Sequence, residues 1–349
     1  MKKIILFMLL ILVIKLLIIG EKLIVFEDLA KPHCLHISDD RVYIVQESNI
    51  FVYDFDNFKF LFKFGKEGQG PGELSKSVFY RNKLITTKKG VLFEGYDKVI
   101  LFSNEGKFIW EKRKMPSVSQ ILPIRNKFVV RRIRTITKSK KEFNCISLYN
   151  QDIKPIKDLF CLESPQQNLA NKMKINMLLD TPIFKVWEDR IYIEKSLKGF
   201  LIDVYDLNGE ILYSIKSPYK NLKLTKNRKK QIIDRYKNDV LVKREGGWDH
   251  FSKINLLVYP DTFPAIQNFE IFDNKIYVQT YKQKEGKDEY WMIDLKGKLI
   301  KKIYLPQFPS ESLLDSILGT KLNCIYKNII YYLEENGEEE WELHHSLIK

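Results

Sequence analysis

Short runs of apolar and aromatic residues, each preceded by Asn or Asp, recur along most of the chain. One copy is Asp40-Arg41-Val42-Tyr43-Ile44, and another is Asp189-Arg190-Ile191-Tyr192-Ile193. Asn and Asp tolerate the left-handed backbone of tight hairpin turns, whereas Val, Ile and Tyr favour strands. Each copy therefore predicts a turn that leads into a β-strand. The six copies begin at Asp40, Asn82, Asn126, Asp189, Asn274 and Asn328.

A second pattern follows most of these copies and consists of an apolar pair, a turn and another apolar run. Examples are Val204-Tyr205-Asp206-Leu207-Asn208-Gly209-Glu210-Ile211 and Met292-Ile293-Asp294-Leu295-Lys296-Gly297-Lys298-Leu299, in which Gly supplies the positive φ of a hairpin turn. Each unit thus holds two hairpins, or about four strands. The first three copies lie 42 and 44 residues apart, which fits the period of about 40–50 residues of four-stranded propeller blades.

The sequence therefore predicts an all-β fold, a six-bladed β-propeller of four-stranded blades. The later gaps between copies are 63, 85 and 54 residues long and require insertions. One is a short helical insertion near 224–238, with Thr225 as N-cap, inside a wider segment of about 218–250. A seventh blade in the 85-residue gap is the rival interpretation. Leu23-Ile24-Val25-Phe26 is expected to close the ring as the outer strand of the sixth blade.

The first 20 residues have the layout of an export signal. Lys2 and Lys3 precede an apolar run from Ile4 to Ile19, interrupted by Lys15, and Gly20 follows. This run is shorter than the roughly 20 residues of a comfortable membrane span. We expect residues 1–20 to be a signal peptide, with an uncleaved N-terminal membrane anchor as the alternative, and residues 21–349 to form the propeller in a periplasmic or other extracytoplasmic compartment.

The positive charge narrows the choice of partners. The chain of 349 residues carries a formal net charge of +14. No nucleic-acid motif accompanies this charge, and export would separate the protein from nucleic acid, so no nucleic-acid partner is expected. An acidic polysaccharide, anionic lipid head groups or an acidic protein is more compatible with it. The candidate binding residues are the basic run and the mixed cluster in the insertion, that is Arg131, Arg132, Arg134, Trp248 and His250.

The glycine-rich stretch Phe64-Gly65-Lys66-Glu67-Gly68-Gln69-Gly70-Pro71-Gly72-Glu73-Leu74 invites a phosphate-binding interpretation. A phosphate-binding loop requires a Lys-Ser/Thr pair that opens a helix, but Glu73 and Leu74 follow Gly72 here, and the flanks predict strands. The structural interpretation is that glycine permits positive φ, Pro71 fixes one φ, and Leu74 re-enters the core. The stretch is therefore expected to connect blades one and two. Its structural residues are Gly65, Gly68, Gly70, Pro71, Gly72 and Glu73.

The succession of Asp40 to Ile44, then Ile50 to Asp54, then Gly70-Pro71-Gly72-Glu73 resembles an NHL-type repeat. It is more similar to the six-bladed β-propeller proteins that many bacteria export. In that family a GxGPGE element closes the first blade, and a helical insertion precedes a Phe-Pro-Ala segment, here Phe263-Pro264-Ala265. The resemblance covers most of residues 24–349 and implies the fold, but no particular activity. Cys34 lacks the lipobox that lipid-anchored relatives carry.

Cysteine and histidine residues offer two further hypotheses. Cys145 and Cys161 flank a predicted hairpin turn near Asn150, so they are a candidate disulfide of an exported protein. His33, Cys34 and His36 suggest a metal site, but alternation on a strand places His33 opposite the other two. We therefore predict no metal site and no cofactor.

We interpret the protein as a non-enzymatic ligand- or protein-binding module that acts as a monomer. Its expected partner is an unknown protein or an anionic or polysaccharide ligand of the cell envelope, and it is expected to meet the membrane only through its N-terminal segment. The alternative is a propeller hydrolase or lyase with a metal such as Ca²⁺ in the central channel. A structural subunit of an envelope complex is a third hypothesis. Catalytic residues are not assigned, because no hydrolase motif is present.

Overall fold

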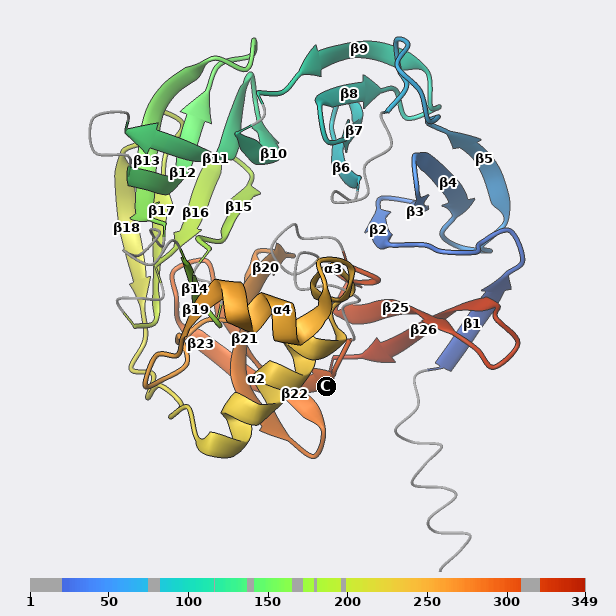
Figure 1. Ribbon diagram of the computed structural model, residues 1–349. Helices are drawn as coiled ribbons and strands as arrows, with labels where there is room; N and C mark the ends of the chain where they lie inside the picture. The colour runs from blue at the N-terminus through green and yellow to red at the C-terminus, as the bar shows by residue number, and fades with distance from the viewer. Residues whose placement is uncertain are drawn as a thin grey trace, which may run out of the picture.

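Six four-stranded antiparallel sheets stand radially around a common axis (Figure 1). The computed structural model describes residues 21–74, 82–115, 117–136, 141–164, 172–178, 181–195, 199–308 and 321–348. Over these residues the predicted six-bladed β-propeller is confirmed, and the rival seven-bladed interpretation is wrong.

The strands of each blade follow one another from the centre of the ring to its edge. The strands of blades one to three are β2 (Cys34–Ser38), β3 (Arg41–Gln46), β4 (Asn49–Asp54), β5 (Phe60–Phe64), β6 (Lys83–Thr87), β7 (Gly90–Glu94), β8 (Lys98–Phe102), β9 (Phe108–Arg113), β10 (Val118–Ile124), β11 (Lys127–Ile136), β12 (Lys141–Tyr149) and β13 (Pro155–Glu163). Those of blades four to six are β15 (Phe184–Trp187), β16 (Arg190–Glu194), β17 (Leu201–Tyr205), β18 (Ile211–Lys216), β20 (Asn268–Phe272), β21 (Lys275–Lys284), β22 (Lys287–Asp294), β23 (Leu299–Pro306), β24 (Asn323–Tyr326), β25 (Ile329–Glu335), β26 (Trp341–Leu347) and β1 (Glu21–Phe26).

The recurring Asn/Asp pattern marks the turn between the first two strands in five of the six blades. In blade two, Asn82 instead precedes the first strand, β6, and the equivalent turn is at Lys88 and Lys89. In blade five both turn residues, Asp273 and Asn274, have positive φ. In blades three and four the left-handed residue is Arg125 or Glu188, one position before Asn126 or Asp189. The two-residue connection thus tolerates several residue types at its first position, and the pattern identifies the turn better than it identifies the strained residue.

The middle strands read as continuous apolar runs because neighbouring blades cover both of their faces. All five residues of β7 and all five of β8 are buried. Phe93 packs in the cluster between blades one and two, whereas Leu92 packs in the cluster between blades two and three. Glu94 is the last residue of β7, and Lys98 is the first residue of β8. Because both side chains are buried, each requires a charged or polar partner.

The ring is closed by the N-terminal strand β1, which pairs antiparallel with β26 at the outer edge of blade six (Figure 1). Ile24 lies opposite Leu343, and Phe26 lies opposite Trp341. The Phe26 side chain is buried against Tyr53 of blade one, with 4.5 Å between ring centroids. The predicted closure by residues 23–26 is therefore confirmed.

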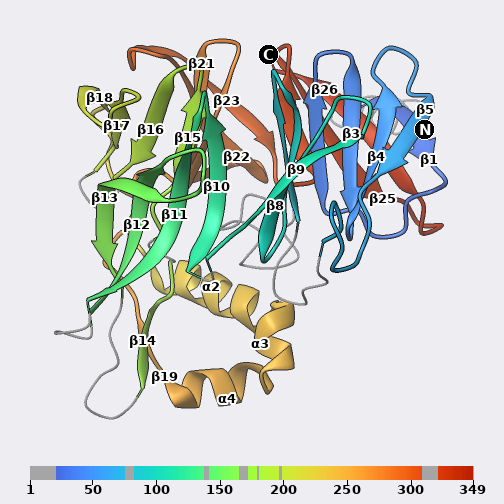
Figure 2. The same ribbon diagram turned by 90° about the horizontal axis from the view of Figure 1, so that it is seen from above.

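The long gap between blades four and five holds a helical insertion on one face of the propeller (Figure 2). Its helices are α2 (Lys226–Asn238), α3 (Val240–Arg244) and α4 (Gly247–Ile254). The oxygen of Thr225 accepts the N–H of Arg228, as expected of the N-cap, so the predicted helix is confirmed. A short parallel pair, β14 (Met173–Asn176) and β19 (Asn255–Val258), joins the insertion to the connection between blades three and four.

Cys145 of β12 and Cys161 of β13 are joined as a disulfide in the structure. The two residues lie directly opposite each other in the antiparallel pair, with Cα atoms 4.1 Å apart. The bond links residues 16 positions apart along the chain. Cys34 and Cys324 are buried free thiols.

Reduction of this disulfide is expected to lower the free energy of unfolding by about 3 kcal/mol, because a cross-link over a loop of this size restricts the unfolded chain. Urea unfolding with and without dithiothreitol measures the loss. Cys145→Ala/Cys161→Ala should show the loss without reductant, whereas Cys34→Ala/Cys324→Ala should still respond to it. An unfolding curve of the native chain that reductant leaves unchanged would contradict the prediction.

Residues 1–20, which carry the predicted signal peptide or anchor, lie outside the described residues. Among the described helices, none combines the length and the apolar character that crossing a membrane requires.

Candidate functional site

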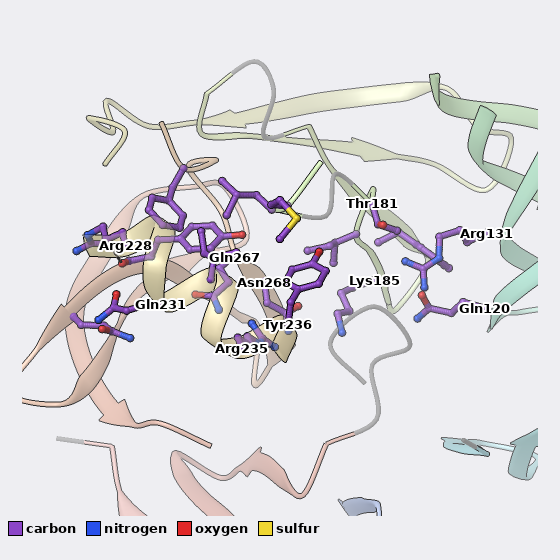
Figure 3. Close-up of a pocket in the computed structure, with 18 residues that line it drawn as sticks. Gln120, Arg131, Thr181, Lys185, Arg228, Gln231, Arg235, Tyr236, Gln267 and Asn268 are labelled. Carbon is purple, nitrogen blue, oxygen red and sulfur yellow. Dashed lines mark hydrogen bonds between the residues drawn. The ribbon is translucent and has the colours of Figure 1, made fainter. Parts of the chain in front are cut away.

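A cavity of about 280 Å³ lies between helix α2 and the ends of the inner strands of blades three, four and five (Figure 3). Eighteen side chains line it. Four are cationic, namely Arg131, Lys185, Arg228 and Arg235. Five carry primary amides, namely Gln120, Gln231, Gln267, Asn268 and Gln283. Asp, Glu and His are missing from the residues that the structure describes around this cavity.

Helix α2 supplies one wall of the cavity through a single face. Arg228, Gln231, Ile232, Arg235 and Tyr236 recur at the i, i+3, i+4, i+7 and i+8 spacing that places side chains on one side of a helix. Tyr236 is buried in a cluster with Met177 and Val242. Ile232 packs in a second cluster with Phe263 and with Tyr281 of β21. The apolar members of the stripe therefore pack the helix against its neighbours and hold the polar members over the cavity.

Arg228 is positioned by two contacts with the segment that follows the insertion. Its Nη1 donates to the carbonyl oxygen of Tyr281 at 3.3 Å, and its guanidinium lies 5.4 Å from the centre of the Phe263 ring. The rings of Phe263 and Tyr281 are themselves 4.6 Å apart. The guanidinium plane is thus held over an aromatic wall, which suits arginine better than lysine.

Lys185 of the cavity lining belongs to a charged triad whose other two members, Glu270 and Lys321, are outside that lining. Glu270 of β20 accepts from Nζ of Lys185 at 2.8 Å and from Nζ of Lys321 at 2.7 Å. Burial alone would raise the pKa of Glu270, but the two lysines overcome this effect and lower it to about 2. Burial lowers the pKa of Lys185, while the charge of Glu270 opposes that shift. One carboxylate thus faces two ammonium groups, which leaves the triad with one excess positive charge.

The predicted basic cluster on β11 divides between two places. Arg131 is buried, lines the cavity and donates from Nε to Oγ of Ser119 at 3.2 Å. Arg132 and Arg134 point to the opposite face of the strand, where both bind the carboxylate of Asp158. The alternation of side chains along a strand explains the division. The structure therefore brings Arg131 alone of the three into the cavity.

Trp248 and His250 lie on α4, outside the cavity. Trp248 packs against Phe251 with 6.0 Å between ring centroids, and it belongs to the cluster that holds the insertion together. His250 is exposed to solvent. These two predicted binding residues therefore do not meet the Arg131 side chain.

A second ion cluster lies inside blade two. Nζ of Lys114 is 2.7 Å from a carboxylate oxygen of Glu94, and neither side chain has any exposed surface. The other oxygen of Glu94 accepts the N–H of Ile121 at 3.2 Å and lies 3.9 Å from Nζ of Lys83. Burial lowers the pKa of Lys83 to about 7, with Glu94 opposing the shift. This cluster binds blade two to blade three.

The glycine-rich loop folds around its own carboxylate. Oε2 of Glu73 accepts the N–H of Gly70 at 2.9 Å, and Oε1 lies 3.0 Å from Nζ of Lys66. These two groups hold the pKa of Glu73 below its ordinary value. Leu74 is buried, and Nζ of Lys98 of blade two donates to the Gly70 carbonyl oxygen at 2.9 Å. The position that a bound anion would need is thus taken by Glu73.

Gly65→Ala is expected to lower the free energy of unfolding by about 2–3 kcal/mol. Gly65 has φ +84°, and an added Cβ would lie 2.5 Å from the Ser48 carbonyl oxygen. A left-handed conformation alone costs an alanine about 1–2 kcal/mol, and backbone overlap adds to it. Gly286→Ala is the matched control, because Gly286 has φ +73° and open space around it. Equal losses by chemical denaturation would show that the overlap is relieved without cost.

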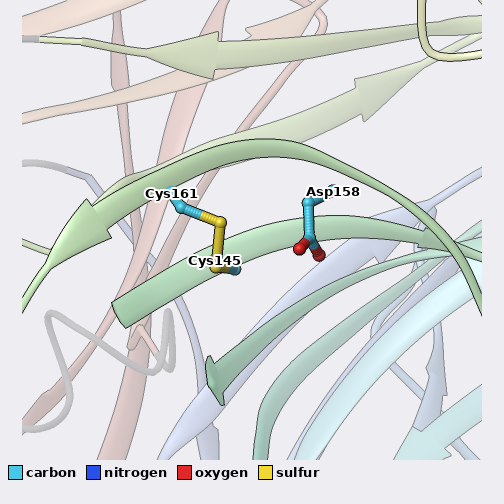
Figure 4. Close-up of side chains that lie close together, drawn as sticks. All are labelled: Cys145, Asp158 and Cys161. Carbon is cyan, nitrogen blue, oxygen red and sulfur yellow. A yellow bond between two sulfur atoms is a disulfide. The ribbon is translucent and has the colours of Figure 1, made fainter. Parts of the chain in front are cut away.

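The residues of the rejected metal hypothesis bind partners in blade two instead. Nε2 of His33 lies 3.1 Å from the Asn82 carbonyl oxygen, and Nε2 of His36 lies 2.8 Å from Oγ1 of Thr86. Burial raises the pKa of the Cys34 thiol. Among the described residues, one group has the spacing of three metal ligands. It consists of Cys145, Asp158 and Cys161, and the disulfide occupies both of its sulfurs (Figure 4).

Sequence reasoning missed most of the cavity. The helix near 224–238 was predicted, but Arg228, Gln231 and Arg235 were not singled out, although their i, i+3, i+7 spacing indicates one polar face. Lys185 and Glu270 carry no local signal, because 85 positions separate them along the chain.

Comparison with known proteins adds little to this description. No protein-family model and no curated protein matches the sequence. Similar solved structures include BamB from Moraxella catarrhalis, with 10% identity over 88% of this chain and 68% of that chain and a TM-score of 0.32. The Pan2 WD40 domain of Neurospora crassa has 10% identity over 92% and 90% of the two chains, with a TM-score of 0.39.

The β-propeller domain of Cps50 (Swd1) from Myceliophteria thermophila has 12% identity over 94% of this chain and 99% of that chain, with a TM-score of 0.40. Identities and TM-scores of this size indicate nothing about the function of this chain. The chain is a β-propeller by its own sheet topology.

Proposed function

We propose that the protein is a binding module that holds an anionic ligand in the cavity between α2 and the centre of the propeller. The observation that supports this proposal is the lining of the cavity, whose described residues include four cations and five amides but no carboxylate. A cleft lined by charged side chains of one sign attracts ligands of the opposite sign. Arginine at such a site binds carboxylate or phosphate through two parallel hydrogen bonds.

The surface of the helical insertion around the cavity also favours a negatively charged ligand. Residues 226–254, which form α2 to α4, contain nine Lys and Arg residues against four Asp and Glu residues. A basic surface at the mouth of a cavity raises the rate at which anions arrive. The insertion therefore serves both as a wall of the site and as an electrostatic guide to it.

The cavity favours binding over the alternative of a hydrolase or lyase. General acid-base catalysis by carboxylates or imidazoles uses side chains that reach the substrate. The described side chains of this cavity offer cations, amides and aromatic rings instead. A role in recognition follows more directly from such a set than a role in bond cleavage.

The site is proposed to work outside the cytoplasm, on a protein or polysaccharide of the cell envelope. The charged and apolar layout of residues 1–20 supports export, and the Cys145–Cys161 disulfide is a bond that oxidising compartments favour. The propeller would be released as a monomer or held by an uncleaved N-terminal segment. The NHL-like exported propellers that the sequence resembles are consistent with this location.

The proposal is tested by titrating the full-length protein with dextran sulfate and with neutral dextran of equal size. We expect binding of the sulfated polymer alone. Arg228→Gln/Arg235→Gln should weaken it by about tenfold or more, the loss of roughly one charge-assisted hydrogen bond. Equal affinity for both polymers would contradict the proposal.

The matched control is Lys230→Gln/Lys237→Gln, which removes two charges at the same spacing from exposed positions of the same helix, away from the cavity. It should change the affinity by less than about twofold, because solvent screens exposed charges. Because Arg228 also contacts Tyr281, thermal unfolding of each variant and the single variant Arg235→Gln separate lost binding from lost fold. If both double variants lower the affinity equally, the polymer binds through the overall positive charge of the helix and not through the cavity.

A further inference from the structure

The cations of the cavity form a row and not a cluster. Figure 3 shows Arg228 and Arg131 at opposite ends, with Arg235 and Lys185 between them. Arg228 and Arg235 are seven residues apart on α2, which is about 10 Å along a helix axis. A single compact anion such as phosphate cannot contact both guanidinium groups. A ligand that uses the whole row must be elongated and must carry negative charge at more than one point.

The groups between the cations specify the neutral part of such a ligand. Gln231 lies between Arg228 and Arg235 on the same face of α2, and Gln267 and Asn268 face it from the start of blade five. A primary amide offers two donors and one acceptor. Hydroxyl groups both donate and accept, so a polyhydroxylated ligand can satisfy a row of amides without leaving polar atoms unpaired.

Aromatic and apolar side chains complete the lining. Phe263 and Tyr281 form a wall with ring centroids 4.6 Å apart, and Phe184 and Tyr236 are buried at other points of the cavity. An aromatic wall beside amides and cations suits a ligand with one apolar face and polar edges, as a pyranose ring has. A ligand with several carboxylates, hydroxyl groups and rings that have an apolar face belongs to one chemical class, the acidic sugars.

The size and openness of the cavity indicate a chain and not a free monosaccharide. The cavity volume of about 280 Å³ lies just below the usual range of small-ligand sites, which starts at about 300 Å³. Gln231, Arg235 and Gln283 are exposed, so the cavity is open to solvent along α2. The enclosed part therefore holds a short stretch of the ligand, and further units would extend into solvent.

On the basis of the proposed function, we infer that the ligand is an oligosaccharide of carboxylated sugars, bound lengthwise from Arg228 to Arg131. The carboxylates pair with the row of cations, and the hydroxyl groups pair with the amides between them. An acidic peptide is the competing macromolecule. A peptide of Asp and Glu offers flexible side-chain carboxylates and amide groups, but no hydroxyl-bearing rings to match the aromatic wall.

The test is calorimetric titration of the full-length protein with oligogalacturonates of one, two, three, four and six units. Neutral malto-oligosaccharides of equal length and an oligoglutamate of equal charge are the comparison ligands. Affinity is expected to rise by about tenfold or more from one unit to three, as additional ion pairs form, and then to level off. Higher salt should weaken the longer ligands more than the monomer.

The α2 variants provide the local readout. Arg228→Gln/Arg235→Gln should reduce the gain with length, whereas Lys230→Gln/Lys237→Gln should preserve it. If galacturonate binds as tightly as its trimer, or if oligoglutamate binds as tightly as hexagalacturonate, the inference is overturned while an anion-binding function stands. If dextran sulfate and every acidic ligand fail to bind, the proposed function itself is wrong.

Discussion

Lys114→Met is expected to lower the free energy of unfolding by about 3–5 kcal/mol, the range for removal of one partner from a buried ion pair. Lys114 and Glu94 are both without exposed surface, and their charged atoms lie 2.7 Å apart. Nζ of Lys114 also donates to the Gly95 carbonyl oxygen at 2.8 Å. The variant removes from the buried Glu94 carboxylate the cation at 2.7 Å, whereas Lys83 lies farther away, at 3.9 Å. Urea unfolding monitored by tryptophan fluorescence measures the change.

Two further variants make this prediction specific to the pair. Lys107→Met removes an exposed lysine of the same blade and should change stability by less than about 0.5 kcal/mol. Lys114→Met/Glu94→Gln should recover part of the loss, because the uncompensated charge disappears together with its partner. A double variant less stable than Lys114→Met would show that Glu94 stabilises the blade mainly through its bond to the Ile121 N–H.

The fold was accessible from the sequence because local signals agree with the global arrangement. Turn residues and apolar runs repeat with the period of a blade, and the spare strand Leu23 to Phe26 has one vacant place in a ring of six blades. The buried Phe26 and its contact with Tyr53 follow from that pairing. The insertion was predicted only in part, since α3 and α4 are short, with five and eight residues against the 13 of α2.

The site was much less accessible, because its parts meet only in the folded ring. Strand alternation alone would have separated Arg131 from Arg132 and Arg134, but nothing near Arg131 indicates that α2 lies above it. The sequence identified Phe263 only as part of the Phe-Pro-Ala segment. Its contact with Arg228 joins residues that are 35 positions apart along the chain. Local chemistry in the sequence therefore identifies charged faces, whereas the pairing of those faces requires tertiary structure.

Glu270→Gln is expected to lower the free energy of unfolding by about 3 kcal/mol at pH 7 and to change its dependence on acid. The carboxylate holds Lys185 and Lys321, and its pKa falls from an ordinary 4.5 to about 2. A group with a lower pKa in the folded state gives its full stabilisation above pH 4.5 and loses it as the pH falls toward 2. Such a shift corresponds to about 3 kcal/mol. Unfolding in urea between pH 2.5 and 7 should therefore depend less on pH in the variant.

The same substitution should act in the opposite direction on ligand binding, which separates a charge effect from general damage. Loss of the carboxylate leaves Lys185 at the floor of the cavity without its negative partner, so the site becomes more positive. We expect trigalacturonate to bind about fivefold more tightly to Glu270→Gln, since an additional charge at partly solvated range contributes about 1 kcal/mol. Glu142→Gln, at an exposed carboxylate on β12, should change neither stability nor affinity. A less stable variant that binds the anion more weakly would indicate that Glu270 shapes the cavity and does not balance its charge.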